Sequence, residues 1–330
     1  MRMLDLFSGI GGFHLGFKKA GFNFDWVGFS ELDKYASAVY KYRFPDAEKL
    51  GDVTAIRSDR LPDNIDVLCG GFPCQAFSMA GKRKGFNDTR RTLFFEIVRI
   101  LRHYRESKKP INYFVLENVK GLLSHDNGRT FATIYRVLTD IGYTVEFQLL
   151  NTRWVLPQNR ERIFIFGRYL GNPSGRKVFP IGESGKESNN RNTEVASTLQ
   201  HPGHSGGNYK GMNMISIPEA TKKGYAEAKV GDSINLSVPN SKTRRGRVGK
   251  GEAQTLDTGM QQYTIDKTAI RRLTPIECMR LQGFPDDWNE KGIIDGKEVN
   301  MSDTQRYKQA GNAVSVPIVS MVAERIKDGQ

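Results

Sequence analysis

A cysteine at the end of a predicted strand is the residue of this sequence best suited to nucleophilic chemistry. Cys74 follows the apolar run Val67–Gly71 and the pair Phe72-Pro73. Pro73 fixes its own backbone and biases the residue before it towards an extended conformation, which gives the thiol a defined direction. Open α/β folds bind ligands beyond the carboxyl ends of their strands, where this thiol would lie. Cys74 is therefore a candidate thiolate nucleophile, and a packed core cysteine is the alternative interpretation.

A glycine-rich turn suggests a nucleotide site at the same end of the sheet. The segment Asp5-Leu6-Phe7-Ser8-Gly9-Ile10-Gly11-Gly12 joins a predicted strand to a predicted helix. Glycines there let a ligand approach the backbone, and the free N–H groups at the start of the helix favour an anion. The spacing differs from that of dinucleotide-binding turns, so this segment alone is weak evidence.

Two acidic positions could complete an adenosine site. Glu31 follows Gly11 by 20 residues and ends the second predicted strand, where an acid can accept hydrogen bonds from ribose hydroxyls. A surface carboxylate is the alternative interpretation of Glu31. Asp52 could accept a hydrogen bond from an adenine amino group, with Val53 packing beside it. Because no pyrophosphate-binding turn is present, S-adenosylmethionine fits these residues better than NAD.

The elements that must position these residues alternate along the first 170 residues. Apolar runs predict strands at 3–7, 26–30, 65–69, 113–116, 145–150 and 162–166. Helical spacing predicts helices after residue 12 and around 93–104 and 131–141. This alternation favours a mostly parallel sheet with helices on both faces.

The composition excludes several classes of protein. The chain has 330 residues, a mean hydropathy of −0.50, and no apolar run close to the about 18 residues of a membrane helix. A predicted strand begins almost at Met1, which leaves no room for a signal peptide. Three cysteines suit a reduced cytoplasmic protein better than a disulfide framework. The net charge of +13 favours a polyanionic partner such as nucleic acid, and a merely basic soluble enzyme is the alternative.

Residues 180–270 differ from the rest of the chain. They are rich in Gly, Asn, Ser, Thr and charge, and their aromatic residues are Tyr209, Tyr225 and Tyr263. A basic run, Lys242-Thr243-Arg244-Arg245-Gly246-Arg247, lies here. Short β-like segments at 214–217, 253–256 and 263–265 favour a small irregular β domain that contacts phosphates, with a disordered insert as the alternative. Regular structure resumes where Thr274 predicts a helix N-cap, and 314–326 predicts a final amphipathic helix.

Six motifs occur in a fixed order over nearly the whole chain. They are Phe7-Ser8-Gly9-Ile10-Gly11-Gly12, Pro73-Cys74-Gln75, Glu117-Asn118-Val119, Gln158-Asn159-Arg160-Glu161-Arg162, Arg272-Leu273-Thr274-Pro275-Ile276-Glu277 with Leu281-Gln282-Gly283-Phe284-Pro285, and Gln309-Ala310-Gly311-Asn312-Ala313-Val314. Together they resemble the DNA (cytosine-5) methyltransferases of bacterial and phage modification systems. Six motifs in sequence are a specific signal, although each one alone is modest evidence.

The resemblance implies a Rossmann-like α/β methyltransferase fold with a small, irregular, β-rich target-recognition domain. The catalytic domain would span residues 1–180 and be completed by 303–330. The family's variable recognition region lies between the fourth and fifth motifs, which places it at 181–270, and a hinge segment would span 271–302.

The resemblance also implies roles for individual residues. Cys74 would be the nucleophile, Glu117 the partner of the cytosine ring, and Arg162 a contact to its carbonyl oxygen, with Arg160 supporting that site. The cofactor pocket for S-adenosylmethionine would be formed by Phe7, Ser8, Gly9, Gly11, Gly12, Glu31, Asp52, Val53, Phe72, Pro73 and Asn312. Contacts to DNA would come from Gln75, Ser78, Arg90, Arg244, Arg245 and Thr255. Thr198-Leu199 competes with Thr255-Leu256 as the recognition pair.

Two positions depart from the family pattern. Arg91 stands where glycine is common, which leaves the flexibility of the segment from Gln75 to Thr92 open. This segment would close over the DNA strand, and a plain solvated loop is its alternative. Ala313 replaces a serine of some members, so one hydrogen bond to the cofactor would be missing.

The chemistry explains why these residue types are needed. Cytosine C5 is a poor nucleophile, and addition of the Cys74 thiolate to C6 gives C5 enamine character. A protonated Glu117 at N3 would relieve the charge on the ring, so we expect desolvation to raise the pKa of this carboxyl. C6 is inaccessible inside a duplex, so the cytosine must be flipped out.

The sequence therefore predicts a cytoplasmic, monomeric enzyme that methylates duplex DNA at cytosine C5 and needs no metal. It would act as the modification enzyme beside a restriction endonuclease, or as a solitary or phage methylase. The histidines His201 and His204 are interpreted as surface residues. Three rivals remain: an RNA cytosine-5 methyltransferase, a Rossmann-fold dehydrogenase, and an inactive DNA-binding regulator. The recognition sequence is beyond reach, because a few side chains at base edges decide it.

Overall fold

The computed structural model describes residues 1–73, 93–170, 176–182, 215–238, 241, 243–259, 261–265 and 270–329. Several sequence predictions lie outside these residues: the roles of Cys74, Gln75, Ser78 and Arg90, the competing pair Thr198-Leu199, and the surface position of His201 and His204.

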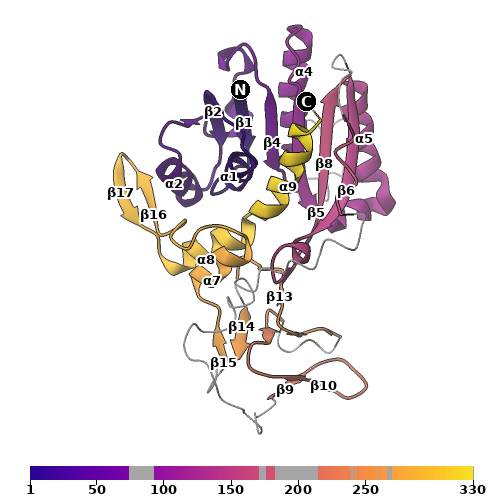
Figure 1. Ribbon diagram of the computed structural model, residues 1–330, viewed down its shortest axis with the longest axis vertical. Helices are drawn as coiled ribbons and strands as arrows, with labels where there is room; N and C mark the ends of the chain where they lie inside the picture. Colours follow the sequence, from indigo (N-terminus) through magenta and orange to yellow (C-terminus); the bar gives the residue numbers. More distant parts are fainter. Residues whose placement is uncertain are drawn as a thin grey trace, which may run out of the picture.

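A seven-stranded sheet forms the centre of the large part of the molecule (Figure 1). In sheet order, the strands are β3 (Glu48–Lys49), β2 (Trp26–Ser30), β1 (Arg2–Leu6), β4 (Val67–Gly71), β5 (Tyr113–Val119), β8 (Glu161–Tyr169) and β6 (Tyr143–Asn151). β1 to β5 pair in parallel, and β8 runs antiparallel to both its neighbours. The predicted mostly parallel sheet is confirmed.

Helices cover both faces of this sheet, as predicted. α1 (Gly12–Lys19), α2 (Lys34–Arg43) and α9 (Val316–Lys327) pack on one face, and α4 (Leu93–Glu106) and α5 (Arg129–Asp140) pack on the other. The sequence of β5 is continuously apolar because the strand is buried on both faces. Tyr113 and Val115 belong to the core with α1, α2 and α9, and Phe114 and Leu116 belong to the core with α4 and α5. The short 3₁₀ helices are η1 (Val53–Ala55), η2 (Ser58–Arg60), η4 (Lys120–Leu123), η5 (His125–Gly128) and η6 (Thr152–Trp154).

β4 begins and ends two residues later than the predicted strand 65–69, because both of its glycines belong to the strand. The parallel pairing with β1 brings Gly70 opposite Leu6. A Cβ atom at Gly70 would lie 2.3 Å from the carbonyl oxygen of Leu6, so only glycine fits there. The strand therefore reaches Gly71, three residues before Cys74, which fixes where the Phe72-Pro73 pair begins.

A smaller β-rich part lies below the sheet in Figure 1. Its strands are β9 (Ile215–Pro218) with β10 (Tyr225–Ala228), and β12 (Val248–Gly249), β11 (Ser233–Asn235), β14 (Gln262–Ile265) and β15 (Ile270–Arg272). Ile217, Ala228, Ile234 and Ile265 form a separate small core. β13 (Ala253–Gln254) pairs in parallel with β7 (Gln158–Asn159) and so connects this part to the large one. The expected small irregular β structure is confirmed, whereas its boundaries at 181 and 270 stay predictions.

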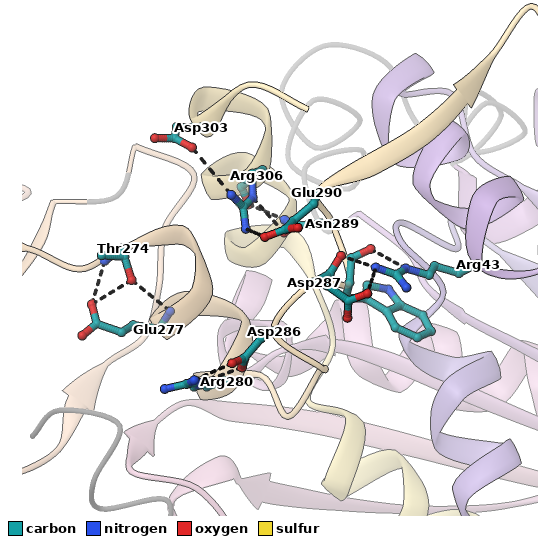
Figure 2. A network of polar contacts seen from close by, with 11 residues as sticks. Arg43, Thr274, Glu277, Arg280, Asp286, Asp287, Asn289, Glu290, Asp303 and Arg306 are labelled. Atoms are coloured by element: carbon teal, nitrogen blue, oxygen red, sulfur yellow. Dashed lines mark hydrogen bonds and ion pairs between the residues drawn. The ribbon is translucent and has the colours of Figure 1, made fainter. Parts of the chain in front are cut away.

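The segment 271–302, predicted as a hinge, packs on the large part. It contains α7 (Pro275–Leu281) and the hairpin β16 (Lys291–Ile294) and β17 (Lys297–Asn300), and α8 (Asp303–Asn312) follows. Thr274 caps α7 in a reciprocal capping box with Glu277, which confirms the predicted N-cap (Figure 2). Buried residues of this segment, such as Met279 and Phe284, share a core with α1 and α9.

Polar contacts fasten the same segment at several points (Figure 2). The Nε atom of Arg43, on α2, donates to the carbonyl oxygen of Trp288 at 2.7 Å, and its Nη2 atom lies 3.0 Å from Asp287. The indole of Trp288 in turn donates to the carbonyl oxygen of Ile10 at 2.9 Å. The segment therefore supports the glycine-rich turn. No helix among the described residues is long and apolar enough to span a membrane.

Candidate active site and DNA cleft

A pocket of about 370 Å³ opens at the carboxyl ends of β1, β2 and β4. Its walls come from the turn after β1, the end of β2, the segment after β4 and the last turns of α8. The lining residues are Phe7, Gly9, Ile10, Ser30, Glu31, Leu32, Asp33, Ala36, Val53, Gly71, Pro73, Leu93, Lys308, Gln309 and Asn312. We call this space the donor pocket. Its position is the one that open α/β folds use for ligands.

Six of the residues predicted for the cofactor line the donor pocket: Phe7, Gly9, Glu31, Val53, Pro73 and Asn312. The other five, Ser8, Gly11, Gly12, Asp52 and Phe72, do not form its wall, although all but Gly12 are chain neighbours of lining residues. Asp52 accepts a hydrogen bond of 2.9 Å from the backbone N–H of Thr54 and so caps η1. A Cβ atom at Gly12 would lie 2.6 Å from Val314, so this glycine permits close packing of α1.

The turn after β1 has an unusual backbone. Phe7 and Gly9 both have a φ of 53°, in the left-handed region. Such a conformation is strained for phenylalanine, and strained residues cluster at functional sites. A Cβ atom at Gly9 would meet no atom within 4 Å, because this position faces open space. The turn therefore exposes its backbone to the donor pocket, as the sequence predicted.

Glu31 closes this turn from the end of β2. Its Oε2 atom accepts a hydrogen bond of 2.8 Å from the N–H of Gly9, and its Oε1 atom accepts one of 2.8 Å from the N–H of Asp33. Burial raises the pKa of the Glu31 carboxyl, although these two hydrogen bonds oppose the shift. The carboxylate can still accept hydrogen bonds from a ligand, since each oxygen has a second lone pair.

The sequence did not single out three polar residues of the donor pocket. Lys308 donates to Asp33 at 2.6 Å and so joins α8 to the start of α2. Burial raises the pKa of Asp33, but the hydrogen bond and charge of Lys308, together with hydrogen bonds from the N–H groups of Ala36 and Tyr35, outweigh burial and lower it. Gln309 is 4% exposed, and neither polar atom of its side chain has a hydrogen-bond partner. A buried amide without partners is costly, so Gln309 is suited to bind a ligand of this pocket.

Glu117 and Arg162 form an ion pair beside the donor pocket. Nε of Arg162, on β8, lies 3.1 Å from Oε1 of Glu117, on β5, and both side chains are largely buried. Oε2 of Glu117 would lie 3.2 Å from a Cβ atom at Gly71, which lines the donor pocket. The structure therefore brings two predicted catalytic residues together beside Gly71, which precedes Cys74 by three residues in the sequence.

Arg160 connects three parts of the chain. Its guanidinium is buried and donates to the carbonyl oxygens of Gly311 at 3.2 Å, Ala313 at 2.9 Å and Leu256 at 3.4 Å. Burial, followed by repulsion from Arg162, lowers the pKa of Arg160 to about 9, so the side chain stays charged at neutral pH. Arg160 thus holds the backbone of these segments together, and its role in supporting the catalytic site stays a prediction.

A second cavity, of about 500 Å³, separates the small β part from the end of the sheet. We call it the recognition cleft. Val119, Lys120, Gly121, Asn159, Glu161 and Arg162 line it on one side, and Asn235, Ser237, Arg244, Gln254, Thr255 and Asp257 line it on the other. Arg162 belongs to this wall and also pairs with Glu117, so the ion pair lies between the donor pocket and the recognition cleft.

The structure separates the described residues that were predicted to bind DNA. Arg244 and Thr255 line the recognition cleft, whereas Arg245 does not. Thr255 donates from its hydroxyl to the carbonyl oxygen of Asn159 at 2.8 Å, which holds it against β7. Arg245 is exposed and donates to the carbonyl oxygen of Ala220 at 2.8 Å.

The remaining cysteines belong to the hydrophobic core. Cys69 and Cys278 are both fully buried, and burial raises the pKa of each thiol. Neither is suited to act as a nucleophile. Among the described residues, no group of three or more His, Cys, Asp or Glu side chains is arranged to hold a metal ion.

Comparison with known proteins gives a consistent result. The model of the C-5 cytosine-specific DNA methylase family matches residues 1–328. The type II methyltransferase M1.ScrFI of Lactococcus lactis subsp. cremoris is 38% identical over 98% of this chain and 77% of its own length. The type II methyltransferase M.NgoBI of Neisseria gonorrhoeae is 39% identical over 96% of this chain and 90% of its own. The S. pombe Dnmt2 methyltransferase has the same fold, with a TM-score of 0.65 at 19% identity over 99% of each chain.

These matches confirm the resemblance inferred from the six motifs, the fold class and the predicted enzyme class. They cover the donor pocket, the ion pair and the recognition cleft alike, since the family model spans nearly the whole chain. The chain therefore belongs to the C-5 cytosine-specific DNA methylase family.

Proposed function

We propose that this DNA cytosine-5 methyltransferase takes its methyl group from S-adenosylmethionine and acts on a cytosine flipped out of duplex DNA, through a covalent bond between Cys74 and C6. The observation that carries this proposal is the position of the Glu117–Arg162 pair, between the donor pocket and the recognition cleft. A base entering from the cleft would meet these two side chains and the methyl donor at one place.

The ion pair suits the pyrimidine edge of cytosine. Arg162 can donate to the carbonyl oxygen of the ring, and Glu117 would donate to N3 once it has taken up a proton. The Cys74 thiolate would add to C6, and the electron pair displaced towards N3 would be stabilised by Glu117. C5 would then have enamine character and could bond to the methyl carbon while the methyl–sulfur bond breaks, which would leave S-adenosylhomocysteine as the product. Loss of the C5 proton to a base, followed by departure of the thiolate, would restore the aromatic ring and free Cys74.

The donor pocket has the groups that S-adenosylmethionine needs. Glu31 can accept from ribose hydroxyls, Val53 offers an apolar surface for adenine, and the unpartnered amide of Gln309 can both donate and accept. When bound, this cofactor supplies a methyl group on a sulfonium, which is electrophilic without any metal. Asn312 and Lys308 would complete the site from α8.

The recognition cleft would hold the duplex. The chain carries a net charge of +13, and Arg244 and Lys120 lie in the cleft walls. Phosphate contacts supply most of the affinity of such proteins and make it depend on salt. We infer a catalytic domain of residues 1–180 and 303–330, a recognition domain at 181–270 and a hinge at 271–302.

The names of the relatives support a role in restriction and modification, because several are type II methyltransferases. A cognate endonuclease acting on the same site would be the partner. A solitary or phage methylase is the second possibility, since the orphan methyltransferase M.SPRI of Bacillus phage SPR is 28% identical over 99% of this chain. We also propose that the protein is a cytoplasmic monomer that associates with the nucleoid through DNA binding.

The nucleophile is tested by Cys74→Ser. We expect this variant to bind duplex DNA normally and to transfer no methyl group from labelled S-adenosylmethionine. A duplex with 5-fluorocytosine at the target should trap the wild-type protein as an adduct, because fluorine cannot leave as a proton does. Turnover by the serine variant, or binding of the fluorinated duplex without an adduct, would contradict the mechanism.

Two of the rival functions are tested by the choice of substrate. Bisulfite sequencing of DNA from cells that express the protein should show methylated cytosines in one short sequence context. An RNA cytosine-5 methyltransferase would instead methylate tRNA and leave duplex DNA unmodified. An inactive DNA-binding regulator would bind the duplex and modify neither substrate.

A further inference from the structure

Three neighbouring residues in the wall of the recognition cleft form a chain of hydrogen bonds. Asn235, at the end of β11, is 4% exposed. Its Oδ1 atom accepts from the N–H of Ser237 at 3.0 Å and from the hydroxyl of Ser237 at 2.7 Å. The hydroxyl oxygen of Ser237 then accepts from Nη1 of Arg244 at 3.0 Å. A buried amide therefore fixes a serine, which in turn fixes an arginine of the cleft.

The backbone around Arg244 is also held. Its N–H donates to the hydroxyl of Ser241 at 3.1 Å. The buried guanidinium of Arg247 donates from Nη2 to the carbonyl oxygens of Val238 at 2.9 Å and Ser241 at 3.2 Å. The N–H of Asn235 donates to the carbonyl oxygen of Arg247 at 2.8 Å, which ties this segment back to β11. Arg244 thus belongs to a braced segment.

Arg244 keeps two donor atoms for a ligand. Only Nη1 has a partner among the described residues, so Nε and Nη2 can donate side by side. The guanidinium is a donor without acceptor capacity, and its fork matches two acceptors at a fixed spacing. In the major groove, guanine presents two acceptors, O6 and N7, whereas the other bases present at least one donor or only one acceptor.

Arg245 provides the contrast. It is exposed, it lies outside the wall of the cleft, and its side chain donates to the carbonyl oxygen of Ala220. A contact to phosphate needs a positive charge but little orientation, whereas base readout needs a side chain held in one direction. The two adjacent arginines therefore suit different tasks.

We propose that Arg244 reads a guanine of the recognition sequence through Nε and Nη2, and that Asn235 and Ser237 position it for this contact. This inference rests on the proposed action on duplex DNA. It makes Arg244 a specificity-determining residue. Arg245 contributes at most a phosphate contact, which is the same for every DNA sequence.

The test uses single-atom changes in the DNA. Once bisulfite sequencing has defined the target site, each guanine of that site is replaced in turn by 7-deazaguanine, which lacks the N7 acceptor. For the wild-type protein we expect kcat/KM to fall about 5- to 150-fold at one of these guanines. For Arg244→Ala we expect a similar loss on the unmodified duplex and no further loss at that guanine.

Arg245→Ala is the matched control. It should keep the full 7-deazaguanine effect, weaken binding of all duplexes equally and reduce the salt dependence of binding by about one phosphate contact. Ser237→Ala is a milder variant that leaves Arg244 present but unanchored, and we expect it to reduce the effect at the same guanine. It serves if Arg244→Ala does not fold, as judged by circular dichroism.

The outcomes separate this inference from the proposed function. If Arg244→Ala weakens all duplexes equally and keeps the 7-deazaguanine effect, Arg244 contacts phosphate and the inference is overturned. If no guanine of the site is sensitive to loss of N7, the inference is also overturned, while methylation itself stands. If the wild-type protein methylates no duplex DNA, the proposed function fails first.

Discussion

The side chain of Asn118 holds the backbone of Phe72. Nδ2 of Asn118 donates to the carbonyl oxygen of Phe72 at 2.7 Å, and both residues are buried. Oδ1 of the same amide accepts from the N–H of Val119 at 2.9 Å, which fixes the orientation of the amide. The motif Glu117-Asn118-Val119 therefore provides one residue of the ion pair and, from the next position, supports the segment that leads to Cys74.

Asn118→Leu should impair catalysis more than donor binding. The leucine cannot donate to Phe72, so the Phe72-Pro73 segment loses a fixed point, and a displacement of about 1 Å near reacting groups can cost about 100-fold in rate. We expect kcat to fall by that order and stability to fall by about 1–3 kcal/mol, since a buried carbonyl is left unpaired. Steady-state kinetics and urea unfolding measure the two effects. Asn112→Leu, directly before the first residue of β5, is the control, and an unchanged kcat in Asn118→Leu would refute the positioning role.

Gln309→Leu should weaken binding of S-adenosylmethionine without destabilising the protein. The amide has no partners in the pocket wall, so its replacement by an apolar group of similar size removes an unpaired polar group. We expect the affinity for the cofactor to fall about tenfold, as measured by calorimetry. Gln158→Leu is the matched control, because its amide is equally buried and unpartnered but lies outside the donor pocket. Equal cofactor affinity of the two variants would argue against a ligand role for Gln309.

Arg160→Met should destabilise the fold. The carbonyl oxygens of Gly311 and Ala313 would lose their shared donor inside the protein. We expect a loss of about 3 kcal/mol in the free energy of unfolding, because unpaired buried carbonyls are costly. Arg153→Met is the control: this exposed arginine pairs with Glu252 at 2.8 Å, and surface pairs contribute at most about 1 kcal/mol. A loss for Arg160→Met no larger than that of the control would contradict the bracing role.

Asp5 should make stability depend on pH. Burial raises the pKa of this carboxyl to about 8, although hydrogen bonds from Cys69 and Tyr40 oppose the shift. Between the ordinary pKa of 3.8 and about 8, the folded protein keeps a proton that the unfolded chain has released. The free energy of unfolding therefore falls as pH rises between these two values. His14 has the opposite effect, because burial lowers its pKa to about 4. The contribution of His14 to the free energy of unfolding therefore rises with pH up to about 6.5.

The effect of Asp5 is therefore clearest between about pH 6.5 and 8. In this window, the free energy of unfolding should decrease by up to about 1.4 kcal/mol for each pH unit. Asp5→Asn should flatten this slope, which urea unfolding at several pH values can measure. An equally steep slope in the variant would assign the pH dependence to other groups.

Much of the site could be predicted from the sequence, because the signals are local. The pair Phe72-Pro73 and the glycines after β1 restrict the backbone within a few residues, and the structure places Gly9 and Pro73 in the donor pocket. Thr274 was predicted as an N-cap from its own neighbourhood, and a capping box is present. Lys308 was missed, and Gln309 was quoted in the sixth motif without a role, because a helix sequence alone does not tell which pocket its last turns face.

The sequence by itself determined the alternation of strands and helices, the order of the motifs and, through them, the family. Periodicity and turn chemistry depend on neighbouring residues, so they can be read along the chain. The tertiary structure alone decided that Arg162 pairs with Glu117, that Arg160 braces Gly311, and that Arg244 faces the recognition cleft while Arg245 does not. The first two relationships join residues that are distant in the chain, and the third separates two adjacent arginines by the direction of their side chains. Only the packing of the whole molecule brings the carbonyls, carboxylates and guanidinium groups within hydrogen-bond distance.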